Sequence, residues 1–237
     1  MKKILIGLIV LTLASCSELL HVISEASQVK NPAITDLDIA NGLKSALNKG
    51  VEKEVEKLTQ TNGFLKNENV KIRFPIELQH VEKKLRDLGL GALPDKGLEL
   101  LNRAAEEAVK EATPIFISAI KNMSFVDARN ILMGHDSSAT KYLELTTRDS
   151  LYEKFYPVME KSFSKSGADK AWSVMISKYN SIPFVKKANT DIKDFVSDCA
   201  LNGVFKMISA EEKSIRNDLS ERTSDLLKKV FSLQDPL

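Results

Sequence analysis

The sequence of this 237-residue chain predicts an all-α fold, a single compact domain of about ten helices. After Pro32, apolar residues recur at alternating intervals of three and four almost to the C-terminus, which is the period of one face of an α-helix. The interruptions between these stretches contain glycine, proline and asparagine, which end helices. With 43% hydrophobic residues, a chain of this length can bury one conventional core.

The first predicted helix begins at a capping box, in which Thr35 is followed three residues later by Asp38. Its apolar face is formed by seven residues at helical spacing, namely Ile39, Leu43, Ala46, Leu47, Val51, Val55 and Leu58. The pair Asn62-Gly63 is a typical stop signal, so we expect the helix to end there.

The short segment 70–74 departs from the helical pattern. Val70, Ile72 and Phe74 alternate with basic residues, which is the period of an extended chain, and Pro75 stops the pattern. One interpretation places this segment across the helices with the three apolar side chains inward. The other makes it a free edge that pairs with a strand of a partner.

Two helices are predicted in the next part of the chain. The first covers 76–88 and ends at Gly89, and the second covers 94–123. Pro114 lies inside the second helix and has no N–H group to donate. We therefore expect it to kink that helix or to split it in two.

The remaining helices are divided by similar signals. A second capping box, made by Ser124 and Asp127, begins a helix that Gly134 closes. Further helices are expected near 136–147, 149–165, 168–180 and 190–207, then from a capping box at 209–212, and finally over 222–231.

The N-terminus resembles a bacterial lipoprotein signal. Two lysines precede an apolar run from Ile4 to Leu13, and the small residues Ala14 and Ser15 precede Cys16 at the expected cleavage point. We expect residues 1–15 to be removed and Cys16 to be acylated, with palmitate among its acyl chains. Residues 16–34 then form a tether, 35–233 the helical domain and 234–237 a short tail.

This signal predicts that the protein is located in the bacterial cell envelope. The apolar run is shorter than the about 20 residues that span a bilayer, so it is not expected to cross the membrane. The mature protein is thus expected to be anchored to the membrane by lipid. Ser17 after the cysteine resembles an outer-membrane sorting pattern, which favours the periplasmic face of the outer membrane in a Gram-negative cell. The apolar residues of 19–23 also allow a short amphipathic helix in the tether.

Charge and cysteine content limit the partners of the mature chain. The precursor has 34 basic and 32 acidic residues, and losing Lys2 and Lys3 with the signal leaves 32 of each, a net charge of zero. This balance provides no electrostatic basis for binding nucleic acid or an anionic membrane surface. If Cys16 carries lipid, Cys199 has no partner for an internal disulfide.

A group of polar residues forms the candidate site. The predicted helix around 98–121 has two apolar stripes, so we expect neighbours on both sides, and Asn102 and Glu106 share the second stripe. A carboxylate buried there needs a partner, for which Arg103 and Arg216 are the candidates. The full candidate cluster or ligand site is Asn102, Arg103, Glu106, Asp127, Thr140, Glu212 and Arg216. It is either a structural ion-pair and hydrogen-bond cluster, the floor of a ligand site, or a catalytic centre at Glu106.

Known catalytic and metal-binding patterns are not found in the sequence. The three histidines have no metal-ligand spacing with cysteine or acidic residues, and there is no nucleophile elbow or glycine-rich phosphate loop. We therefore expect no metal, no cofactor and no catalytic residues. Cys199 lies on an apolar helical stripe with Gly203, which favours a small core residue and a close helix crossing.

Several of these stretches together resemble a bacterial family catalogued as domain of unknown function 4197. The matching residues are 102–106, Asp127-Ala128, Ile131-Leu132 with Gly134, Ala139-Thr140 with Tyr142, Phe155 with Pro157, Leu201 with Gly203 and Phe205, Glu211-Glu212 with Ile215-Arg216, 226–228 and Val230-Phe231. They occur in order from about residue 36 to 231, and Ser138 is a minor departure, where alanine is expected. The resemblance implies an all-helical, often lipidated or exported envelope domain, and it implies no activity.

These observations lead to a functional hypothesis. We expect a non-enzymatic ligand-binding or protein-interaction module of the envelope, whose partner is a small or lipid-like ligand or an envelope protein. The alternative is an envelope enzyme that uses a carboxylate centred on Glu106, together with Asp127 or Glu212.

Overall fold

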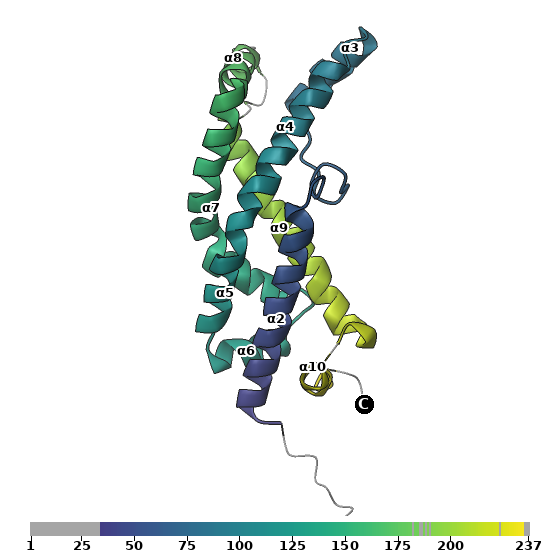
Figure 1. Ribbon diagram of the computed structural model, residues 1–237, viewed down its shortest axis with the longest axis vertical. Coiled ribbons are helices and arrows are strands. Elements are labelled where there is room, and N and C mark those ends of the chain that lie inside the picture. The colour runs from purple at the N-terminus through teal and green to yellow at the C-terminus, as the bar shows by residue number, and fades with distance from the viewer. Residues whose placement is uncertain are drawn as a thin grey trace, which may run out of the picture. The chain divides into compact units, whose positions relative to one another are not determined.

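Three long helices dominate the protein, which is described by a computed structural model (Figure 1): α2 (Asp36–Thr59), α7 (Ser138–Ser166) and α9 (Ile192–Asn217). The structure describes residues 34–181, 183, 184, 187, 189, 191–222 and 224–234. The other helices are α3 (Ile76–Asp87), α4 (Ala92–Ala108), α5 (Ala112–Asn122), α6 (Phe125–Leu132), α8 (Ala168–Asn180) and α10 (Asp225–Phe231), with 3₁₀ turns η1 (Val109–Glu111) and η2 (Leu219–Glu221). No strand occurs in these described ranges, which confirms the predicted all-α class.

Residues from Asp36 onward form one compact unit. In it, α7 packs against α9, α4 and α5, and α2 packs against α5, α6 and α9. The core between these helices consists of fully buried aliphatic and aromatic side chains, among them Phe116 and Phe205, whose rings meet edge to face 5.8 Å apart. The predicted signal peptide 1–15 and all of the tether except Ile34 lie outside the described residues.

The expected break near Pro114 is confirmed. The helix predicted over 94–123 is divided into α4 and α5 by the turn η1, and Pro114 lies in the first turn of α5. Proline is tolerated there because the amides of a first helical turn have no partner within the helix. Both halves pack against α7 and α2, and α4 also contacts α9.

Two predicted helix boundaries are wrong. The helices expected at 136–147 and 149–165 are the single helix α7, and those expected at 190–207 and from 209 onward are the single helix α9. The proposed capping residues at 209–212 have other partners: Glu211 accepts a 2.6 Å hydrogen bond from Lys53 on α2, and Glu212 bonds to α7. Neither junction contains a glycine or proline, so the helices continue and their number is smaller than about ten.

The segment 70–74 is irregular chain laid against the helices, as the first interpretation expected. Val70 and Ile72 are buried and Phe74 is half-buried. Gly203 of α9 makes this approach possible, because a Cβ atom there would lie 2.9 Å from the Phe64 ring and 3.3 Å from Val70 Cβ. A close approach thus occurs at Gly203, but it is made by the loop after α2 and not by a crossing helix. Cys199, on the same helix, is only half-buried.

The two ends of the unit differ in their elements (Figure 1). The start of α2 lies at the same end as α6 and α10, both of which pack against α2. At the other end lie α3 and α8, which pack against α4 and α7.

Candidate functional site

The first polar cluster is centred on Glu106 of α4, whose side chain is 6% exposed. One carboxylate oxygen accepts hydrogen bonds from the backbone amides of Phe64 (3.1 Å) and Leu65 (3.4 Å). The other oxygen accepts a 2.6 Å bond from Arg103, which also donates to Asn62 Oδ1 at 2.9 Å. Both oxygens are therefore occupied, and the cluster fastens the loop after α2 to α4.

Asn102, one residue before Arg103, fastens the next part of the same connection. Its Oδ1 accepts from the Ile72 amide at 2.8 Å, and its Nδ2 donates to the Ile72 carbonyl at 2.9 Å and to Leu98 O at 2.7 Å. The amide side chain thus pairs with the backbone of Ile72 as a neighbouring strand would. The groups that a partner strand would use at Ile72 are already bonded.

The second polar cluster joins α9 to the beginning of α7. Glu212 accepts hydrogen bonds from the Ala139 amide at 2.9 Å and from the Thr140 amide and hydroxyl, both at 2.8 Å. These amides belong to the first turn of α7, which has no acceptors for them within the helix. The negative carboxylate also complements the positive end of the α7 dipole.

Arg216 completes this second cluster on the opposite side of Glu212. Its guanidinium donates to Glu212 Oε1 at 2.9 and 3.0 Å, to Leu132 O at 3.0 Å and to Ile131 O at 2.8 Å. The two carbonyls are the last of α6, where a cation is favourable. One ion pair therefore caps the end of α6 and the beginning of α7.

The structure thus divides the predicted site residues into two clusters and one separate residue. Asn102, Arg103 and Glu106 form the first, and Thr140, Glu212 and Arg216 form the second. Asp127 belongs to neither: it forms the capping box with Ser124 that begins α6, as predicted. Of the two partners proposed for Glu106, Arg103 is correct and Arg216 is wrong, because Arg216 pairs with Glu212.

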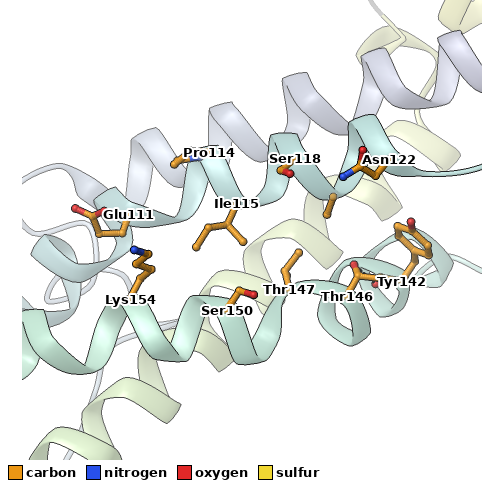
Figure 2. Close-up of a pocket in the computed structure, with 11 residues that line it drawn as sticks. Glu111, Pro114, Ile115, Ser118, Asn122, Tyr142, Thr146, Thr147, Ser150 and Lys154 are labelled. Carbon is orange, nitrogen blue, oxygen red and sulfur yellow. Dashed lines mark hydrogen bonds between the residues drawn. The ribbon is translucent and has the colours of Figure 1, made fainter.

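A groove between α5 and α7 was not identified from the sequence. It has a volume of about 690 Å³ and is lined by Glu111, Pro114, Ile115, Ser118, Ala119 and Asn122 on one side and by Tyr142, Thr146, Thr147, Ser150 and Lys154 on the other. Figure 2 shows Ile115 between the two helices, with Glu111 and Lys154 at one end and Asn122 and Tyr142 at the other. The groove therefore has charged or amide side chains near its ends and a mixed middle, where Ile115 lies beside Ser118, Thr147 and Ser150.

Several polar side chains of this groove form no hydrogen bond with other described residues. Among the described residues, no hydrogen bond or ion pair involves the side chains of Glu111, Ser118, Asn122, Ser150 or Lys154, or the Tyr142 hydroxyl. Burial, with a smaller effect of the nearby Asp127 carboxylate, raises the pKa of Tyr142 above its ordinary value. Its phenol therefore keeps its proton at neutral pH and can donate a hydrogen bond.

The sequence does contain a signal for this groove. Pro114, Ser118 and Asn122 recur at intervals of four on α5, as do Thr146, Ser150 and Lys154 on α7. Small side chains that face each other from two packed helices leave space at the surface. A smaller hollow of about 320 Å³ lies beside α3, but its Glu82 and Arg86 already form an ion pair at 2.8 Å.

Metal binding and membrane spanning have no support in the described residues. No group of three or more His, Cys, Asp or Glu side chains is arranged there to hold a metal ion. Likewise, none of the helices described is long and apolar enough to cross a membrane.

These features define an all-α helical domain in which buried ion pairs fasten the helix ends and loops around a core, with an open groove on one side. The chain belongs to the family described as "Protein of unknown function (DUF4197)", whose model matches residues 33–232. No curated protein and no solved structure matches the chain significantly.

Proposed function

We propose that this protein is a non-enzymatic binding module of the bacterial cell envelope, anchored by acylated Cys16 and using the groove between α5 and α7 as its binding surface. The observation that supports binding is the groove itself. Its volume of about 690 Å³ falls within the range of small-molecule sites, roughly 300–1,000 Å³. Its unbonded polar side chains lie beside the apolar side chains of Ile115 and Ala119.

The lining indicates the chemistry of the ligand. The serine, tyrosine and asparagine side chains offer both donors and acceptors, whereas the Thr146 and Thr147 hydroxyls already donate to carbonyls of α7. The apolar side chains of α5 favour a ligand with one hydrophobic face. Glu111 and Lys154 supply one charge of each sign at the same end, so the groove as a whole has no net charge. We infer a small, largely uncharged ligand with several hydrogen-bonding groups, of which a lipid-like or sugar-like molecule is an example.

The contacts of Glu106 support a non-enzymatic role. A catalytic carboxylate must reach a substrate, whereas both oxygens of Glu106 accept hydrogen bonds from Phe64, Leu65 and Arg103. The Glu212 oxygens are occupied in the same way, by α7 amides and Arg216. For this reason we favour binding over the alternative of an enzyme centred on Glu106.

The binding proposal can be tested by native mass spectrometry of the full lipidated chain, purified gently from a bacterial envelope. A ligand in the groove adds a reproducible mass, and Ser118→Trp should remove it by filling the groove. Ser173→Trp is the matched control, because Ser173 is also exposed but lies on α8. An added mass that survives Ser118→Trp, or a bare chain in every preparation, would contradict the proposal.

The anchoring proposal has its own test. Cys16→Ser should remove acyl labelling and release the protein from the membrane fraction, because the tether then has no lipid. The domain should remain folded, since Cys16 lies outside the compact unit that begins at Asp36. Unchanged acyl labelling of the variant would refute the anchor without affecting the groove.

A further inference from the structure

Helix α6 has an exposed face that is unusually apolar for its length. Phe125, Val126 and Met133 are 56%, 68% and 59% exposed. With 100° between successive residues, these three lie on one face of α6, on either side of Arg129, while Ala128, Ile131 and Leu132 face the core. Two large apolar side chains in water on one eight-residue helix, with a third on the residue that caps its end, indicate a contact surface.

The entry point of the chain adjoins this face. Arg129 donates a 2.8 Å hydrogen bond to Asp36, the first residue of α2, and the next residue, Leu37, is 55% exposed. The segment that leads to Cys16 is therefore attached beside the apolar face of α6. Leu37, Phe125, Val126 and Met133 are called the entry face below.

We propose that the entry face rests on the surface of the lipid bilayer that holds the protein. This inference rests on the proposed anchoring at Cys16 and is independent of the groove. Even fully extended, residues 16–35 span at most about 70 Å. The domain is thus confined close to the bilayer with its entry end attached.

Because the tether keeps the domain near the bilayer, the contact between the entry face and the lipid can be weak. A tether of this length holds the attached surface at an effective concentration on the order of millimolar near the membrane. A weak apolar contact is then enough to orient the domain, although it would not recruit an untethered protein. The zero net charge of the mature chain fits this, because no electrostatic attraction to anionic lipids is required.

A second exposed apolar group makes the proposal specific. Leu88 and Leu90, at the turn between α3 and α4, and Leu93, in the first turn of α4, are 74%, 47% and 62% exposed. This turn adjoins α3, at the end of the unit opposite α6 (Figure 1). The tether enters at the α6 end, which favours the entry face over the turn as the surface in contact with the protein's own membrane.

The test is to attach an environment-sensitive fluorophore to single cysteines in the full lipidated chain, reconstituted in phosphatidylethanolamine vesicles with a minority of phosphatidylglycerol. Val126→Cys reports on the entry face and Leu90→Cys on the opposite turn. Val174→Cys on α8 is the matched control, since Val174 is 58% exposed. Cys199 will react little at neutral pH, because burial raises the pKa of its thiol to about 11, and Cys16 is already bonded to lipid.

We expect a blue shift and a several-fold increase in emission at Val126→Cys on reconstitution, together with quenching by brominated lipids. The labels at Leu90→Cys and Val174→Cys should keep the emission seen in water. Adding Phe125→Ser to the Val126→Cys chain should remove most of the change.

Four other outcomes are distinguishable. If the chain floats with the vesicles but the Val126→Cys label still reports water, the inference is wrong and the anchor is unaffected. A membrane signal at Leu90→Cys alone would assign the opposite orientation and overturn it. If the label at Val126→Cys responds equally in a lipid-free Cys16→Ser chain at high protein concentration, a second copy covers the face. Failure of the unaltered chain to float would refute the anchor itself, and with it this inference.

Discussion

The two ion-pair clusters of this domain use the same type of residue pair in different surroundings. Glu212 and Arg216 on α9 are 5% and 4% exposed, and they bond to backbone groups at the ends of two other helices. Glu106 on α4 is equally buried, but its partner Arg103 is 35% exposed and the pair holds a loop. The Glu212–Arg216 pair thus joins helix ends inside the core, whereas the Glu106–Arg103 pair holds a loop at the edge of the core.

This difference determines what the loss of a partner would cost. When a partner of a buried charge is removed, the remaining charge has neither its ion pair nor water, and the cost is several kcal/mol. At the edge, water can replace the missing group, and the cost falls toward that of a surface pair, about 0–1 kcal/mol. The comparison therefore predicts an ordering of variants by their effect on stability.

The largest effect is expected for Arg216→Ala. This change leaves the Glu212 carboxylate without its cation and removes one hydrogen bond from each of the Ile131 and Leu132 carbonyls, so the free energy of unfolding should fall by about 3–5 kcal/mol. Chemical denaturation of the domain measures it. Arg148→Ala is the matched control, because Arg148 pairs with Glu144 at the surface, where the loss should stay below about 1 kcal/mol. A loss under about 0.5 kcal/mol at Arg216 would show that the pair is not buried.

A matched pair of substitutions, Glu212→Gln and Glu106→Gln, compares the clusters directly. At position 212 every orientation of the new amide points an N–H₂ group at a donor, either Arg216 or the amides of α7. At position 106 the N–H₂ group can face Arg103, which is free to swing into water. We expect losses of about 3 kcal/mol and about 1 kcal/mol respectively.

Denaturation curves of the two glutamine variants measure this difference. If both variants lose the same free energy of unfolding, the exposure of Arg103 does not reduce the cost of the substitution. The predicted difference in stability between the core cluster and the edge cluster would then be wrong. The same Glu106→Gln protein also tests the enzymatic alternative, since a folded variant that lost an envelope activity of the parent would favour catalysis.

Asn102→Ala tests how much the edge cluster of Asn102, Arg103 and Glu106 contributes to local stability. The change removes both hydrogen bonds to the backbone of Ile72, which is buried, and the expected cost is about 1–3 kcal/mol. Hydrogen exchange should show faster exchange of the Ile72 amide, while the Ala139 and Thr140 amides of the other cluster stay protected. Loss of protection in both places would indicate that the clusters unfold together.

The comparison also separates what the sequence predicts from what it does not. The all-α class, the capping box at Ser124, the break near Pro114 and the inward side chains of 70–72 all depend on local spacing, and each is confirmed. The burial of Glu106 was also predicted, because it lies on an apolar stripe of its helix, and Glu212 and Arg216 were among the candidate cluster. These features are encoded within one element or at its boundary.

The partners themselves depend on tertiary packing. Nothing within α9 indicates that Glu212 faces the first turn of α7 or that Arg216 faces the last carbonyls of α6, so these residues were grouped with Glu106 in one cluster. Arg222, which donates to the carbonyls of Ile215 and Arg216 and is 2% exposed, was missed for the same reason. The groove was missed because it requires two faces of small residues to be opposed.

The smallest effect is expected at the beginning of α6, which contrasts with its end. The Ser124 hydroxyl accepts a 3.0 Å bond from the Asp127 amide in an exposed capping box, whereas Arg216 caps the carbonyls at the other end inside the core. Ser124→Ala should therefore cost only about 1 kcal/mol, because water can reach the released amide. Unfolding curves of this variant and of Arg216→Ala compare the two ends of one helix. If the Ser124→Ala loss equals the Arg216→Ala loss, the cost of an unpartnered helix end does not depend on burial, and the distinction between the core and the edge of this domain fails.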